Sequence, residues 1–290
     1  MKIIETKNLT KMYGKSRGIL QLNLSVEEGD VFGFIGPNGA GKSTTIRTLL
    51  GLISPTEGEA YIFGRDCTKH KKEILKDIGY MPSETQFYSQ MRVEDVIKLA
   101  ADLHKKDCKA EAARLCERLQ LDTKKRMEEL SLGNRKKVNI VCAMQHNPRL
   151  LILDEPTSGL DPLMQKEFFE ALKEKNKEGT TIFFSSHVLF EVQEHCKNAA
   201  IIREGKLIKT AAVTELMAGN AKTVTLAGVQ DISMLHHVSG VENTENGVRF
   251  LYNGDMQELL QHLCRLNPVD VTITEPGLEE IFMHFYEEGR

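Results

Sequence analysis

The stretch Gly36-Pro37-Asn38-Gly39-Ala40-Gly41-Lys42-Ser43 matches the pattern Gly-x-x-x-x-Gly-Lys-Ser/Thr. The apolar run 31–35 precedes it, and residues 42–50 after it have the composition of a helix. In a strand–loop–helix setting the glycines let backbone N–H groups surround phosphate oxygens, and the helix N-terminus adds partial positive charge. The pattern therefore predicts a phosphate-binding loop, in which Lys42 reaches the β- and γ-phosphates and the Ser43 hydroxyl reaches Mg²⁺.

A second signal is the apolar run Leu150-Leu151-Ile152-Leu153, which ends in Asp154 and Glu155. Many strands end in a charged turn, so this pattern is weak by itself. It becomes specific when it follows a phosphate-binding loop in the same chain. We expect Asp154 to hold Mg²⁺ through water and Glu155 to polarise an attacking water as general base.

Composition narrows the class of protein. Of the 290 residues, 41% are hydrophobic and 27% charged, which argues against long disorder, and the net charge of −3 argues against a globally basic nucleic-acid binder. The six cysteines show no C-x-x-C spacing, so we interpret them as reduced thiols of a cytosolic protein. The N-terminal residues lack the apolar core of a signal peptide, and no apolar run approaches the ~18–20 residues of a membrane span.

Hydrophobic periodicity predicts an α/β fold with a mainly parallel, helix-covered sheet, because strands and helices alternate along residues 1–210. A helical insert at about 84–145 interrupts this alternation, and an antiparallel β portion flanks the sheet. Residues 211–290 read as a small α+β unit without a recognisable catalytic motif. They hold four basic and twelve acidic side chains, about −8, whereas residues 1–210 carry about +5. This change of sign favours a domain boundary near residue 210.

The ordered motifs of residues 1–210 resemble the nucleotide-binding subunit of an ATP-binding cassette (ABC) transporter. Ser158-Gly159-Leu160-Asp161 resembles the D-loop, which in that family contacts the opposite subunit across the dimer. Ser186-His187 closes an apolar strand and resembles the switch histidine, with His187 near the γ-phosphate and the attacking water. Tyr13 resembles the aromatic residue that stacks on adenine; the alternative is a buried tyrosine at a strand end.

The resemblance implies ATP and Mg²⁺ as cofactors and assigns roles to individual residues. Glu155 and His187 are the expected catalytic residues. Mg²⁺ is expected at Ser43 and Asp154, and at Ser83 through a water molecule. The expected ATP-binding residues are Tyr13, Gly36, Pro37, Asn38, Gly39, Ala40, Gly41, Lys42, Ser43 and Thr44, together with Ser131 and Gly133 acting on the ATP of a partner subunit.

Two motifs depart from the commonest family pattern. Leu130-Ser131-Leu132-Gly133-Asn134 stands where L-S-G-G-Q is usual, so Ser131 and Gly133 remain while Leu132 and Asn134 are substitutions. Ser83 stands where the family usually has a glutamine that contacts Mg²⁺ and the attacking water. The basic residues 135–137 follow the first motif, and we interpret them as a solvated helix face rather than a nucleic-acid patch.

The end of the chain, Glu275-Pro276-Gly277-Leu278-Glu279-Glu280-Ile281-Phe282, resembles a C-terminal extension of exporter ATPases of the drug, sodium and antimicrobial-peptide type. The alternative is an ordinary surface helix over 278–286 that packs on its own sheet. The extension favours export over import.

The function predicted from these features is that of the ATP-hydrolysing subunit of an ABC exporter for a drug, antibiotic or peptide. A separate transmembrane permease supplies the pore and docks near the Ser83 loop and the helical insert. A second ATP-binding subunit completes a homodimer or heterodimer, and the assembly lies on the cytoplasmic face of the cell membrane. Two alternatives stay open: a non-transport ABC ATPase that acts on ribosomes or DNA, and a weakly active regulatory subunit, suggested by Ser83, Leu132 and Asn134.

Overall fold

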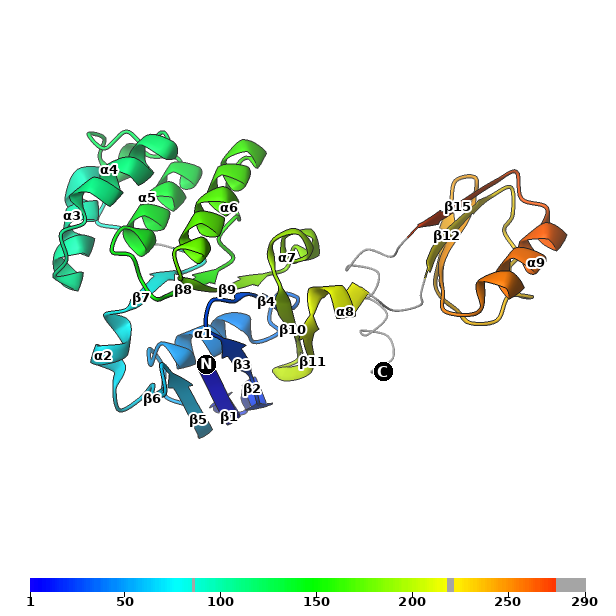
Figure 1. The fold of residues 1–290 in the computed structure, drawn as a ribbon, viewed down its shortest axis with the longest axis horizontal. Helices are drawn as coiled ribbons and strands as arrows, with labels where there is room; N and C mark the ends of the chain where they lie inside the picture. Colours follow the sequence, from blue (N-terminus) through cyan, green and yellow to red (C-terminus); the bar gives the residue numbers. More distant parts are fainter. Residues whose placement is uncertain (85–86, 218–221, 275–290) are drawn as a thin grey trace. The chain divides into compact units, whose positions relative to one another are not determined.

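The computed structural model describes residues 1–84, 87–217 and 222–274. The chain divides into two compact units, Met1–Thr210 and Ala211–Arg290. Figure 1 shows the elements of both units.

The first unit is built on a six-stranded sheet, and this confirms the expected α/β fold. The strand order is β11-β10-β4-β9-β8-β7, and the pairs from β10 to β7 are all parallel. The strands are β4 (Val31–Ile35), β7 (Ile78–Met81), β8 (Leu150–Asp154), β9 (Thr181–Ser186), β10 (Asn198–Arg203) and β11 (Lys206–Ala212). Strand β8 is buried along its whole length, as its unbroken apolar sequence predicts.

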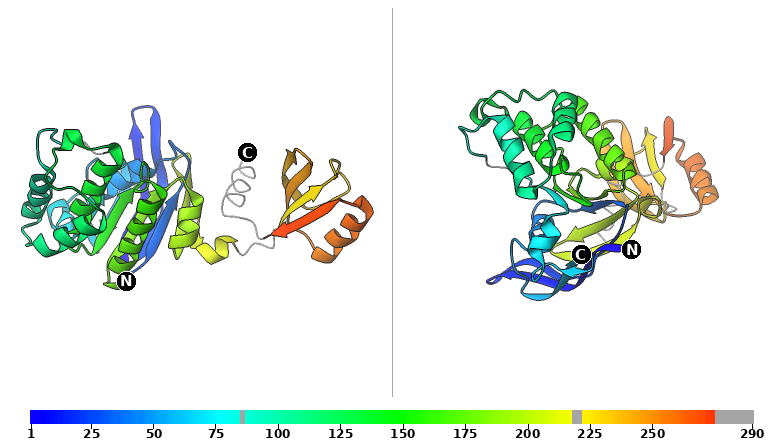
Figure 2. Two further views of the ribbon diagram at one scale, coloured as in Figure 1. Left: turned by 90° about the horizontal axis from the view of Figure 1, so that it is seen from above. Right: turned by 60° about the vertical axis from the view of Figure 1, so that its left-hand side comes forward.

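Helices cover both faces of this sheet. Helix α1 (Lys42–Leu49) lies between the six-stranded sheet and an antiparallel sheet, whereas α6 (Pro162–Lys177) and α7 (Leu189–His195) lie on the other face (Figures 1 and 2). One apolar cluster fills the space around α1, and its members include Ile46, Leu49, Ile152 and Phe183. The core therefore fixes the helix that follows the phosphate-binding loop.

The antiparallel sheet has the order β2-β1-β5-β6, with β3 paired to β1. Its strands are β1 (Lys2–Tyr13), β2 (Ser16–Leu22), β3 (Ser25–Glu27), β5 (Glu57–Ile62) and β6 (Arg65–Asp66). The sequence predicted a flanking antiparallel portion but not β1 itself. Irregular register at Leu9, Lys11 and Met12 breaks the period-two burial of β1, which removes the usual sequence signal of a strand.

The helical insert contains α3 (Val93–His104), α4 (Lys109–Arg118), the short 3₁₀ helix η1 (Met127–Glu129) and α5 (Leu132–Met144). The preceding α2 (Lys71–Leu75) leads into β7. Ion pairs join α4 to α6: the Arg118 guanidinium lies 2.7 Å from Glu174, and the buried Lys175 ammonium lies 2.7 Å from Glu111. The insert is thus attached to the sheet domain through charged side chains as well as through apolar contacts.

The second unit begins with α8 (Val213–Met217) and continues as a four-stranded antiparallel sheet, ordered β13-β14-β12-β15, with α9 (Met256–Leu266) against it. Its strands are β12 (Lys222–Ala227), β13 (Val238–Thr244), β14 (Gly247–Tyr252) and β15 (Asp270–Thr274). It has its own apolar cluster, which includes Val224, Phe250 and Leu259. The helix expected over 278–286 lies outside the described residues.

Because each unit has its own apolar cluster, damage to the second core should leave nucleotide binding intact. Phe250 is 1% exposed, so Phe250→Ala is expected to destabilise the second unit by about 3–5 kcal/mol. ATP affinity is expected to stay within about twofold of wild type, because substitutions away from a site usually have small effects on it. Calorimetric unfolding and ATP titration measure the two effects.

The matched control is Phe183→Ala in the first core, which should weaken both folding and ATP binding. A Phe250→Ala protein that keeps a native circular dichroism spectrum but loses ATP affinity would contradict the independence of the two units.

Candidate functional site

Three strands of the central sheet end side by side and carry the motif residues at their carboxyl ends. In the parallel register Ile35 of β4 pairs with Ser186 of β9, and Asp154 of β8 pairs with Ser185 of β9. The loop 36–41 follows β4, Glu155 follows β8 and His187 follows β9. Since the carboxyl ends of parallel strands meet at one edge, segments that are far apart in sequence converge there.

The loop 36–41 borders a cavity of about 160 Å³ that also contacts Glu155. Its backbone requires glycine at Gly41, where φ is 111° and a Cβ would lie 2.8 Å from the Gly18 carbonyl oxygen. Helix α1 begins at Lys42, and no side chain in the described ranges caps it. The first N–H groups of a helix lack intrahelical partners, so this end offers donors and positive partial charge to an anion.

Lys42 is buried at the floor of this cavity, with 5% of its surface exposed. Its ammonium donates to the carbonyl oxygens of Gly36 and Pro37, at 2.6 and 3.2 Å, and lies 3.3 Å from Glu155 Oε1. The loop therefore holds the lysine in place through its own backbone.

Glu155 lies between this lysine and His187. Its Oε2 is 3.4 Å from His187 Nδ1, and the histidine is 47% exposed. The Glu155 backbone has a φ of 49°, in the left-handed region, and its N–H donates to both the carbonyl and the hydroxyl oxygen of Ser185. The structure thus brings Lys42, Glu155 and His187 together, as the sequence motifs suggested.

Asp154 is almost fully buried, and its Oδ1 accepts a hydrogen bond of 2.6 Å from the Ser185 hydroxyl. Across the described part of the chain there is no cluster of three or more His, Cys, Asp or Glu side chains that could hold a metal ion. Mg²⁺ commonly uses one or two protein oxygens and completes its shell with water and substrate phosphates. A hydroxyl and a carboxylate are donors of the kind that Mg²⁺ uses; Ser43 borders the cavity, whereas Asp154 is 1% exposed and does not line it.

Tyr13 ends β1 beside the cavity. It is 46% exposed, so it is not a buried tyrosine. A Cβ placed on Gly18, which borders the cavity, would lie 3.0 Å from the Tyr13 ring. An exposed aromatic face therefore lies next to the phosphate-binding loop.

Ser131 and Gly133 lie at the start of α5 and do not line the cavity of their own chain. Ser131 is the exposed N-cap of α5, and its hydroxyl accepts from the Asn134 N–H at 3.3 Å. A Cβ on Gly133 would lie 3.0 Å from the Gly159 carbonyl oxygen. Asp161, in the same loop as Gly159, caps α6 by accepting from the Met164 N–H.

Two cations near the site were not predicted. Arg17 borders the cavity and pairs with Glu204 at 2.9 Å, and no sequence pattern marks it. The expectation that residues 135–137 form a solvated face is wrong for Lys136, which is 6% exposed. Its ammonium donates to the carbonyl oxygens of Glu155 and Ser83. Helical spacing carried a signal for this, because Lys136 shares a helix face with the buried Ile140 and Ala143.

Comparisons with known proteins give the family of the chain. The family model for the ABC transporter matches residues 19–158. The chain is 38% identical to the bacitracin transport ATP-binding protein BcrA of Bacillus licheniformis, over 99% of this chain and 98% of that protein. It is 29% identical to the linearmycin resistance ATP-binding protein LnrL of Bacillus subtilis, over 97% of both.

Solved structures give the same fold. An ATP-binding subunit of an ABC transporter superposes with a TM-score of 0.69 at 29% identity, covering 74% of this chain and 91% of that one. A dimeric ATP-binding cassette in a post-hydrolysis state, bound to ADP and Pi, superposes with a TM-score of 0.64 at 23% identity, covering 72% and 98%. Within the described ranges, none of the helices combines the length and the apolar character needed to cross a membrane.

Lys42→Ala is expected to weaken ATP binding by about 10- to 100-fold, because it removes a charge-assisted donor at the floor of the cavity. Titration with a fluorescent ATP analogue measures the change. Thermal unfolding checks that the protein stays folded after the loop carbonyls lose their donor. Lys15→Ala, an exposed lysine outside the cavity, is the control. Unchanged ATP affinity in a folded Lys42→Ala protein would rule out this cavity as the phosphate site.

Proposed function

The chain belongs to the ATP-binding cassette family of ABC transporter subunits, and on that basis we propose that it powers the export of an antibiotic or peptide through a separate permease. It is an ATP-binding subunit of an ABC transporter and an ATPase. The observation that best supports a competent motor is the position of Glu155, which lies 3.3 Å from Lys42 and 3.4 Å from His187.

The chemical step is in-line attack of water on the γ-phosphate of ATP. We assign Glu155 as the general base that accepts the water proton, while the bond between the γ-phosphorus and the β–γ bridging oxygen breaks and ADP leaves. His187 orients the carboxylate and the water. Without nucleotide, Lys42 neutralises Glu155; the phosphates of ATP compete for that ammonium and so release Oε1 for the proton transfer.

We assign several further contacts to ATP. The backbone N–H groups of residues 39–44 and the N-terminus of α1 bind the phosphates, and Tyr13 stacks on adenine. Ser43 and Asp154 would hold Mg²⁺, with Ser83 as a further ligand through water. The ion would supply positive charge at the phosphates.

We further propose that two subunits close over two ATP molecules. Ser131 and Gly133 lie at an exposed helix N-terminus that does not line the cavity of their own chain, which fits a role on the nucleotide of a partner. Leu132 beside them is 72% exposed, and this apolar side chain would be covered by the partner subunit. The partner is a second copy or a homologous chain.

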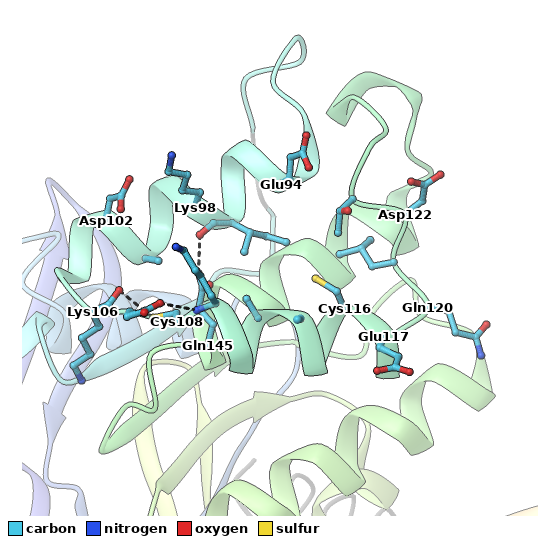
Figure 3. A pocket seen from close by; sticks show the side chains of 18 residues that line it. Glu94, Lys98, Asp102, Lys106, Cys108, Cys116, Glu117, Gln120, Asp122 and Gln145 are labelled. Carbon is cyan, nitrogen blue, oxygen red and sulfur yellow. Dashed lines mark hydrogen bonds between the residues drawn. The ribbon is translucent and has the colours of Figure 1, made fainter.

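The permease contact is proposed to lie in the helical insert. A groove of about 950 Å³ runs between α3 and α4, with Ile97, Ala112 and Leu121 among its apolar lining. Figure 3 shows Glu94, Lys98 and Asp102 along α3 and Cys116 on α4. An apolar floor with charged margins fits a short amphipathic segment of a membrane subunit. The ATPase would then lie on the cytoplasmic face of the membrane.

The exported compound is inferred from the relatives. BcrA is named for bacitracin transport and LnrL for linearmycin resistance, and both match along nearly the whole chain, the second unit included. We therefore favour an antibiotic or peptide as the exported substrate over a ribosome- or DNA-associated role.

Glu155→Gln tests the proposed reaction. The substitution keeps the size of the side chain and the backbone carbonyl but removes the base, so turnover is expected to fall by about 10²- to 10⁴-fold. ATP affinity is expected to hold or rise, because no carboxylate competes with phosphate for Lys42. Phosphate release and size-exclusion chromatography with ATP and Mg²⁺ measure turnover and ATP-dependent dimerisation. Wild-type turnover in this variant would show that Glu155 is not the base.

Ala113→Arg tests the permease contact. Ala113 is an exposed residue of α4 that lines the groove, so a long charged side chain there should obstruct part of it without disturbing the core. Binding to the co-expressed permease is expected to be lost, while the ATPase rate of the isolated protein stays unchanged. Ala110→Arg, exposed on the same helix but outside the groove, is the control. Equal permease binding by both variants would place the contact elsewhere.

A further inference from the structure

A buried ammonium group lies behind the candidate catalytic carboxylate. Lys136, in the first turns of α5, is 6% exposed. Its Nζ donates to the carbonyl oxygen of Glu155 at 2.9 Å and to that of Ser83 at 3.2 Å. One side chain therefore connects three segments that are remote in sequence: α5, the residue after β8 and the segment after β7.

Burying this lysine is costly unless its charge is compensated. Burial lowers the pKa of Lys136, while the nearby carboxylates of Glu155 and Asp154 oppose that shift. Two backbone carbonyl oxygens accept hydrogen bonds from its ammonium. An apolar side chain could fill the same space without the cost of desolvation, but it could not bind either carbonyl. The ammonium is thus suited to holding these two carbonyls.

The Glu155 backbone needs such support. Its φ of 49° lies in the left-handed region, which is uncommon for residues other than glycine. On one side its N–H is held by Ser185, and on the other its carbonyl is held by Lys136. The direction in which the carboxylate leaves the backbone depends on both anchors. Losing one of them would let the peptide rotate and move the carboxylate away from Lys42 and His187.

We propose that Lys136 is a positioning residue for ATP hydrolysis. Its ammonium fixes the backbone of Glu155 in the left-handed conformation and fixes the Ser83 segment to the same point. This inference rests on the proposed role of Glu155 as the base. A displacement of α5 or of the Ser83 segment then moves the base, so the contact also links events in the helical insert to the chemical step.

Lys136→Met keeps the length of the side chain and removes its donors. It is expected to lower kcat by about 10²-fold, the effect of misplacing a reacting group by about 1 Å. KM and ATP affinity are expected to stay within about twofold of wild type, because Lys136 does not line the cavity. Lys136→Gln keeps a neutral donor and should recover part of kcat. Lys137→Met, on the same helix, is the control and should keep wild-type turnover.

A double substitution separates positioning from a general structural role. If Lys136 acts through Glu155, Lys136→Met should not lower the residual turnover of Glu155→Gln any further. Wild-type kcat in Lys136→Met, or an additional loss in the double variant comparable to that in the single one, overturns the proposal. If Lys136→Met does not fold, Lys136→Gln provides the same comparisons. Wild-type turnover of Glu155→Gln would instead reject the proposed function itself.

Discussion

The parallel register of β4, β9 and β8 is the constraint on which the rest of the site depends. It sets Ile35 beside Ser186 and Asp154 beside Ser185, so the three loops that follow leave the sheet at one edge. A shift of one residue in either pairing would turn buried side chains toward the wrong face. The strands resist such a shift because all five residues of β8 and all six of β9 are buried. The geometry of the site is thus fixed by packing well away from it.

Much of the fold was predictable because its signals are local. Helices α6 and α9, for example, each follow an aspartate whose carboxylate caps the helix, Asp161 and Asp255. The phosphate-binding loop and the acidic end of β8 were visible for the same reason. Each needs only a short run of residues in order.

The features that escaped prediction depend on contacts that are remote in sequence. Arg17 reaches the cavity because β2 returns alongside β1, and nothing in its own neighbourhood indicates this. Lys136 looks like part of a basic run until α5 packs against the sheet and its ammonium meets the carbonyl oxygens of Glu155 and Ser83. The run of basic residues indicates a surface, and only the helical spacing to Ile140 and Ala143 indicates the buried position that the tertiary fold gives Lys136.

The ion pairs between α4 and α6 have a consequence for how stiffly the helical insert is held. Arg114 and Arg118 meet Glu174 with side chains that are partly in water, and pairs of this kind are screened by salt and contribute little individually. Lys175 differs, since 2% of its side chain is exposed and it pairs with Glu111 of α4. Separating the two arginines from Glu174 therefore costs little, whereas separating Lys175 from Glu111 removes one of the two carboxylates paired with a buried ammonium, the other being Glu178. The buried pair between Lys175 and Glu111 is therefore the firmer attachment of the helical insert. Ionic strength controls how strongly the exposed pairs hold it.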